Sequence, residues 1–254
     1  LTSCYTSDQK NTIQFDNSKD GIVSSGQPLA SKAGVDIMRQ GGNAIDAAVA
    51  TAFVLSVVEP SMSGIGGRLQ VIFRLPNGDV RGIDASTQVP ELYDPENHEK
   101  SSYGYSTIGI PGVVAGLVKL NAEYGKLPLE TVMLPAIKYA SEGFSILPGE
   151  AMRHAYVEKI IGEFDGTKKY FLDDTGNTYK EGKLFIQEDL SKTLKAIAEN
   201  GKDGFYSGEI AEKMVQDIQE NGGILTMNDL KNYKAVESKI LKSTYKGHDV
   251  NTLY

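Results

Sequence analysis

The residue types that most often carry catalysis are sparse in this sequence. Its 254 residues include one cysteine and three histidines, and the histidines stand far apart at His98, His154 and His248. Such spacing provides neither the clustered ligands of a zinc site nor a Cys–His or Ser–His–Asp arrangement that would activate a nucleophile. We therefore expect surface or loop positions for the histidines, no metal, and no catalytic group supplied by this chain alone.

Carboxylates in turns and a glycine-rich loop are the next candidates for chemistry. Asp173, Asp174 and Asp203 stand in turn-like sequence, which favours solvated side chains over an acid–base pair. The run Gly64-Ile65-Gly66-Gly67 follows a predicted helix and precedes a predicted strand, the reverse of the order in a dinucleotide-binding loop. A loop of this kind is suited to contacts between backbone amides and a ligand.

The helix that leads into this loop is predicted to be buried on all sides. Residues from Ala44 to Val58 are almost all small or apolar and leave no polar face. Asn43 is placed to cap the helix, with Asp46 near its positive end. About fifteen residues are too few to span a membrane, which takes about twenty. The helix is therefore predicted to be a scaffold that positions the loop.

Helical and strand patterns elsewhere predict a mixed α/β domain rich in helices. Asn77-Gly78, between the strand-like runs 69–75 and 80–85, is a strong hairpin signal. Other predicted helices cover 28–40, 111–123, 128–142, 187–199, 207–220 and 226–233, and other predicted strands cover 21–25, 239–245 and 248–253. The last strand runs to the final residue, so we expect the natural chain to continue beyond Tyr254.

Composition limits the partners. The net charge of −7 argues against nucleic acid, because phosphate binding needs clustered Lys and Arg. The single cysteine, Cys4, lies in Leu1-Thr2-Ser3-Cys4, which resembles the end of a bacterial lipoprotein signal. In this interpretation Cys4 carries lipid, residues 1–20 form a flexible tether, and the protein is extracytoplasmic and anchored to a membrane. The alternative is a tail with an accidental cysteine, which leaves a cytoplasmic location open.

Several ordered blocks together resemble the heavy chain of the gamma-glutamyltransferase (gamma-glutamyltranspeptidase) family of N-terminal-nucleophile hydrolases. The resemblance covers about residues 21–254. Its main blocks are GGNAIDAAVA from Gly41, Val58-Glu59-Pro60, Ser63 to Gly67, Pro111-Gly112, Ala115-Gly116, Tyr124-Gly125, Pro135-Ala136, Gly204-Phe205-Tyr206, Asn221-Gly222-Gly223 and Asp229-Leu230 with Tyr233. One block would be weak evidence, but the joint order of all of them is specific.

The resemblance implies the four-layer αββα sandwich of these hydrolases, with residues 21–254 as an incomplete domain that supplies the heavy-chain part. It implies a precursor that cuts itself, so that the new N-terminal Thr of the light chain becomes nucleophile and base. That Thr is expected beyond Tyr254, so the resemblance places no catalytic residue here. It implies no cofactor. The implied partners are the protein's own light chain and a small-molecule amide, cleaved through an acyl-enzyme.

The resemblance also points to the end of the hairpin. Typical members carry an Arg-Glu pair there, and the Arg forks onto the α-carboxylate of the γ-glutamyl group. Here Ser86 and Thr87 stand in those places, and neither supplies the charge. The stretch is closer to an acylase and amidohydrolase branch with an Asn-Ala-Ser-Gly-Arg-like sequence, except that Gln88 replaces its Arg. Arg68, next to the glycine loop, either restores the cation or is an exposed residue at a strand start.

The candidate substrate-binding residues are therefore Arg68, Ser86 and Gln88. They fit a γ-glutamyltransferase or glutathione hydrolase, or an acylase or amidohydrolase that acts on a different amide. A non-catalytic binding module on the same fold is the alternative of another class. The sequence beyond Tyr254 discriminates between them, because a Thr nucleophile in a Thr-Thr-His-like context indicates an enzyme.

Overall fold

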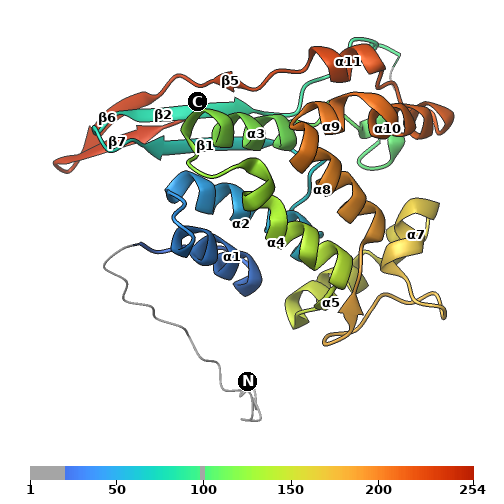
Figure 1. Ribbon diagram of the computed structural model, residues 1–254. Coiled ribbons are helices and arrows are strands. Elements are labelled where there is room, and N and C mark those ends of the chain that lie inside the picture. Colours follow the sequence, from blue (N-terminus) through green and yellow to red (C-terminus); the bar gives the residue numbers. More distant parts are fainter. Residues whose placement is uncertain (1–20, 98–100) are drawn as a thin grey trace.

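The computed structural model describes residues 21–97 and 101–254, so Cys4 and the predicted tether lie outside the described residues. The helices are α1 (Pro28–Arg39), α2 (Ala44–Val58), the 3-10 helix η1 (Tyr105–Thr107), α3 (Val113–Tyr124), α4 (Leu129–Glu142), α5 (Pro148–Tyr156), α6 (Glu158–Ile161), α7 (Asp165–Phe171), α8 (Glu188–Asn200), α9 (Asp203–Tyr206), α10 (Gly208–Glu220) and α11 (Met227–Asn232). The strands are β1 (Leu69–Arg74), β2 (Val80–Ala85), β3 (Phe144–Ser145), β4 (Leu184–Phe185), β5 (Val236–Glu237), β6 (Leu241–Tyr245) and β7 (His248–Thr252). Figure 1 shows a small sheet along the top of the molecule, with α3 in front of it and α2, α4 and α8 beneath.

Helix α2 forms the centre of the helical layer. The side chain of Asn43 accepts hydrogen bonds from the N–H groups of Ile45 and Asp46, and Asp46 accepts the N–H of Asn43 in return, which completes a capping box. The helix is buried on most sides, but Ala44 and Ala48 are exposed. The expectation of burial on all sides was wrong along that stripe. Among the described residues, the extended segment 21–25 and α1 border this stripe without covering it, and alanine side chains expose little apolar area.

The capping box of α2 also holds the loop between α3 and α4. Asp46 is fully buried and accepts the N–H groups of Lys126 and Leu127 in the loop between α3 and α4. The side-chain amide of Asn43 donates to the Tyr124 carbonyl at 2.7 Å. One buried carboxylate and one amide therefore join α2, α3 and α4.

Strands β1, β2 and β5 form an antiparallel sheet, in that order. The predicted hairpin is confirmed, with Leu69 paired to Ala85 at its open end and Gly78 at φ 92° in its turn. Along β1 the side chains alternate between half-buried and exposed, while Ile83 and Ala85 of β2 are buried. The half-buried face packs on α3, which therefore fixes the position of the hairpin's open end.

Two other predictions about strands had different outcomes. The strands at 239–245 and 248–253 are confirmed as the hairpin β6–β7. Residues 21–25 form no strand, so that prediction was wrong. They run along α2, where Ile22 and Val23 share a groove with Ala48, and a helix offers no free backbone ladder to an extended segment.

The apolar core lies mainly between the helices and under the sheet, with Phe53, Ile83, Leu117, Met133 and Leu194 among its fully buried members. The molecule has the mixed α/β architecture predicted from the sequence. In the described part of the chain, no helix has the length and apolar character that crossing a bilayer requires.

Candidate functional site

Arg68 and Ser86 lie at the same end of the β1–β2 hairpin. The ladder pairs Leu69 of β1 with Ala85 of β2. Arg68 and Ser86 are therefore the next residues beyond the last pair, one before β1 and one after β2. Residues opposite each other in such a ladder have Cβ atoms about 5 Å apart. Arg68 is exposed, and within residues 21–97 and 101–254 its guanidinium has no hydrogen bond or ion pair. An exposed cation with no ionic partner among the described residues thus stands at the same end of the hairpin as Ser86.

The hydroxyl of Ser86 is already engaged. It donates to Asp84 Oδ1 at 2.6 Å, and the Ser86 N–H donates to the same oxygen at 2.9 Å. These bonds, with a further one from the Tyr254 hydroxyl, keep the pKa of Asp84 below its usual value. Because its proton points to an ionised carboxylate, the Ser86 oxygen offers an incoming ligand only an acceptor.

Gln88 lies on the segment that leaves the hairpin. Its N–H donates to the Ile110 carbonyl at 3.2 Å, and the Ile110 N–H donates back to the Gln88 carbonyl at 2.8 Å. The side chains of Thr87 and Gln88 are exposed. The structure therefore places Arg68 and Ser86 at the same end of the hairpin, and Gln88 lies two residues after Ser86.

The glycine-rich loop borders the same end of the sheet. The Gly67 carbonyl accepts the N–H groups of Gly112 and Val113 and so holds the first turn of α3. Between Gly64 and Gly67, the backbone N–H groups have no hydrogen-bond partner in the described part of the chain. These amides remain available to a ligand, as the sequence predicted.

Two buried tyrosines hydrogen-bond to the backbone around this site. The sequence analysis did not identify them as functional. The Tyr233 hydroxyl donates to the Ser86 carbonyl at 2.8 Å, and the Tyr206 hydroxyl donates to the Pro111 carbonyl at 2.8 Å. Their rings stack at 5.7 Å with an interplanar angle of 3°. Both tyrosines belong to blocks that had signalled the resemblance, which was the one available hint.

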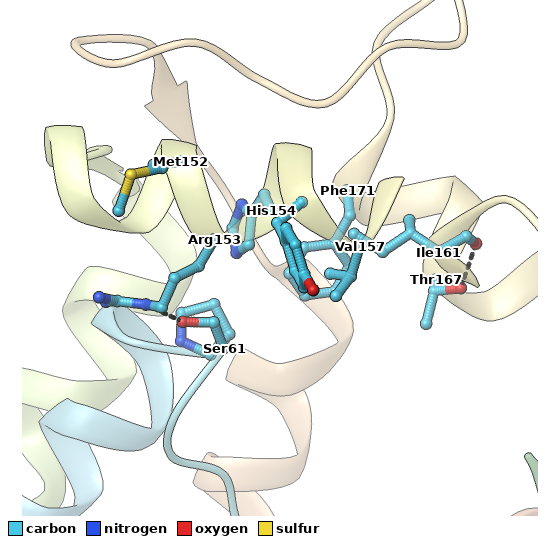
Figure 2. A pocket seen from close by; sticks show the side chains of 10 residues that line it. Ser61, Met152, Arg153, His154, Val157, Ile161, Thr167 and Phe171 are labelled. Carbon is cyan, nitrogen blue, oxygen red and sulfur yellow. Dashed lines mark hydrogen bonds between the residues drawn. The ribbon is translucent and has the colours of Figure 1, made fainter. Parts of the chain in front are cut away.

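Away from the hairpin, a hollow lies between α5, α6, α7 and the segment after α2 (Figure 2). Its volume is about 620 Å³ and its wall is mostly apolar, with Val157, Ile161 and Phe171 among the lining residues. His154 also lines it and is only 2% exposed. The expectation of a surface or loop position was wrong for this histidine, because its ring packs on Phe171 at 5.2 Å within the core side of α5. His248 is exposed as expected, and His98 lies outside the described residues.

The polar wall of this hollow is a closed network around Glu150. This carboxylate is 3% exposed and accepts the N–H and hydroxyl of Ser61, while Arg153 bridges Glu150 and Glu59. Burial alone would raise the pKa of Glu150, but the close approach of His154 Nε2 at 3.0 Å and hydrogen bonds from Ser61 and Arg153 outweigh it and lower the pKa to about 2. Ser61 bonds to the carboxylate and not to the imidazole, so the cluster is not a nucleophile triad. Its role is to fasten α5 to the end of α2.

The turn carboxylates behave as predicted. Asp173 accepts the N–H groups of Thr175 and Asn177 and the Thr175 hydroxyl, which closes its own turn. Asp203 is exposed and pairs with Lys202 as a solvated side chain, but the expectation of a turn was wrong for it, because it is the first residue of α9. In the part of the chain that the structure describes, no group of three or more His, Cys, Asp or Glu could hold a metal ion.

Comparisons with known proteins identify close relatives. A family model described as gamma-glutamyltranspeptidase matches residues 30–253. The chain is 36% identical over 247 residues to a glutathione hydrolase proenzyme of Escherichia coli, covering 92% of this chain and 42% of that protein. It is also 36% identical over 253 residues to the glutathione hydrolase proenzyme of Bacillus subtilis, covering 94% and 42%. The chain therefore spans about two fifths of the length of these curated relatives.

Solved structures give the same picture. The gamma-glutamyltranspeptidase of Helicobacter pylori is 35% identical, with a TM-score of 0.92 over 94% of this chain and 71% of that one. A cephalosporin acylase from Bacillus halodurans is 28% identical, with a TM-score of 0.85 over 98% of this chain and 50% of that one. Both a transpeptidase and an acylase thus share the fold.

Proposed function

This chain belongs to the gamma-glutamyltranspeptidase family, and we propose that it is the heavy-chain part of a self-processing enzyme that cleaves a small-molecule amide. The match over residues 30–253 carries this proposal, because it includes every element that builds the hairpin site. The relatives named as proenzymes support a product that is cut into two chains. The acyl group would pass to a light-chain Thr and then to water or an amine, as in glutathione hydrolysis or γ-glutamyl transfer.

In this proposal the heavy chain supplies part of the acyl-donor site. Arg68, which has no ionic partner in the described residues, would pair with the α-carboxylate of a γ-glutamyl group. The amides between Gly64 and Gly67 and the side chain of Gln88 would border the same group. Asp84 and Ser86 present negative charge and an acceptor, which suits a donor with an ammonium or N–H group.

The test is an assay of two proteins side by side. The full-length protein should release p-nitroaniline from γ-glutamyl-p-nitroanilide or from another anilide, whereas the 254-residue chain alone should not. The reason is that the described residues contain no activated nucleophile, and the resemblance places it in the light chain. Turnover by the purified 254-residue chain, after a contamination control, would contradict this assignment. An inactive full-length protein that also lacks the nucleophilic Thr would favour the binding module.

A second candidate function is an acylase or amidohydrolase that acts on an amide without a γ-glutamyl group. The observation that favours it is Ser86, which stands in place of the carboxylate-binding arginine and is engaged by Asp84. The likeness to a cephalosporin acylase supports the same branch. The two candidates differ in what Arg68 does, and a substitution there separates them.

We also propose that the protein is extracytoplasmic and that lipid on Cys4 anchors it to a membrane. The support is the lipobox-like Leu1-Thr2-Ser3-Cys4, because two of its four residues have the required type and spacing. In the native organism, Cys4→Ala should move the protein from the membrane fraction to the soluble fraction. An unchanged distribution on an immunoblot of the two fractions would refute the anchor.

A further inference from the structure

Tyr233 reaches across the fold to the backbone of the candidate site. It follows α11, 147 residues after Ser86 in the sequence, and is 3% exposed. Its hydroxyl donates to the Ser86 carbonyl at 2.8 Å. The Ser86 N–H and hydroxyl are held by Asp84, so all polar groups of this residue have partners. The bond from Tyr233 holds the one group of Ser86 that its own strand leaves free.

Tyr206 holds the facing segment in a matching way. Its hydroxyl donates to the Pro111 carbonyl at 2.8 Å and accepts the Ala115 N–H at 3.2 Å, so it fixes the start of α3. The parallel stack of the two rings joins these attachments. Burial raises the pKa of Tyr233 to about 12, so its hydroxyl keeps the proton that it donates at neutral pH.

Gly112 closes the space between the two segments. A Cβ atom placed there would lie 1.9 Å from the Ala85 carbonyl oxygen and 2.4 Å from the Tyr233 hydroxyl. A side chain at this position would push the end of β2 and the hydroxyl of Tyr233 apart. The exchange of hydrogen bonds between Gln88 and Ile110 joins the same two segments one step further on.

We propose that Tyr233 is a positioning residue that holds Ser86 and the segment to Gln88 in the geometry that binds the acyl donor. This inference rests on the proposed function, because that function makes the segment a substrate contact. Without the hydroxyl, the Ser86 carbonyl loses its partner and the segment is held only at Asp84 and Ile110. The ring would still pack on Tyr206, so the fold keeps its core.

The experiment compares Tyr233→Phe with wild type in the full-length enzyme. We expect KM for the acyl donor to rise about three- to tenfold with kcat unchanged within about twofold, the pattern of lost uniform binding. Hydrogen exchange of a peptide that covers residues 84–90 should accelerate by a similar factor. Tyr124→Phe is the matched control, since its hydroxyl contacts the exposed Glu237 and its ring packs on Phe73 in the same part of the fold. It should change neither KM nor exchange at 84–90.

Three outcomes of this experiment would contradict the inference. Unchanged exchange at 84–90, or unchanged KM in an active enzyme, would overturn it. Loss of a cooperative melt in Tyr233→Phe would also overturn it, because the hydroxyl would then serve the whole fold. If the wild-type full-length protein cleaves no amide, the proposed function fails, and the exchange measurement alone still decides whether Tyr233 holds the segment.

Discussion

Directly after β2, the chain has Ser86 at the place where the family resemblance implies an arginine. Ser86 donates to Asp84, so a substrate carboxylate placed there would meet an acceptor and a neighbouring negative charge. Arg68 precedes β1, the strand paired with β2. Among the described residues it is the one exposed cation next to Ser86 in the hairpin register. In the proposed function, the preference for an acyl donor therefore depends on whether Arg68 binds the donor's carboxylate.

The first prediction concerns this pair in the full-length enzyme. Losing one side of a carboxylate–guanidinium pair costs roughly 2–5 kcal/mol, or on the order of thirty-fold to several thousand-fold. In the Arg68→Ala background, where the carboxylate has lost its cation, we expect Ser86→Arg to raise kcat/KM for glutathione by at least about thirty-fold while a neutral acetyl-anilide is little affected. Arg68→Ala should reduce kcat/KM for glutathione and leave the neutral amide unchanged.

The outcomes of that comparison separate the candidate functions. A wild-type preference for glutathione that Arg68→Ala abolishes makes Arg68 the carboxylate contact and excludes the acylase. A wild-type preference for the neutral amide, unaffected by Arg68→Ala, supports the acylase. A preference for glutathione that neither substitution changes would show that the carboxylate is bound elsewhere.

The second prediction concerns Glu150 and acid stability. Its pKa falls from 4.5 to about 2 on folding, so its contribution to stability is fully present above pH 4.5 and is lost as the pH falls from 4.5 towards 2. That contribution is roughly 3 kcal/mol at neutral pH. Urea unfolding of Glu150→Gln should show this loss at pH 7 and a smaller one at pH 3. Glu209→Gln, in an exposed pair with Lys213, is the control and should leave the free energy of unfolding close to that of wild type at both pH values. An equal loss at both pH values would contradict the ionic role of Glu150.

Among the elements, α2 depends most on its first turn. Asn43 caps the helix and also donates to the Tyr124 carbonyl, so its removal leaves groups on two elements without partners. Asn43→Ala should lower the free energy of unfolding by about 2 kcal/mol, at the upper end for a cap. Thr226→Ala, in the capping box of the six-residue α11, is the comparison and should cost about 1 kcal/mol. A denaturant titration of both variants checks the order, and a larger loss at Thr226 would contradict it.

The same element scale explains what the sequence could predict. Helices α2, α8 and α10 have long apolar patterns and clear ends, and the Asn77-Gly78 turn specifies its hairpin locally. The region 143–185 shows no long apolar pattern, because its elements are short. There β3 and β4 have two residues each and are held by contacts such as that between Phe144 and Phe185. No local pattern signals a contact across 41 positions.

The site was predictable to a smaller extent. Arg68, Ser86 and Gln88 were predicted as candidates from a family pattern. The hairpin register then explains why Arg68 and Ser86 lie at the same end of the hairpin. Tyr233 was not found as a site residue, because its partner stands 147 positions away. The burial of His154 was missed for a similar reason, since Phe171 and Glu150 supply its surroundings only in the folded chain.

At the scale of the whole molecule, the chain matches about two fifths of each curated relative. The largest sheet among the described residues has three strands, and Gln70, Ile72 and Arg74 on one face of β1 are exposed. In the αββα sandwich implied by the family, a second sheet would cover such a face. We therefore propose that a light chain, produced from the same precursor, covers this face as the partner of this chain.

The most direct test of that requirement is the mass of the full-length protein after purification and incubation. We predict two chains on a denaturing gel and by mass spectrometry, with the second chain beginning at a threonine. Replacing that threonine with alanine should leave one uncut chain. A single uncut chain in the wild type, under conditions in which the protein is folded, would contradict the assignment of this chain as the heavy-chain part of a self-processing enzyme.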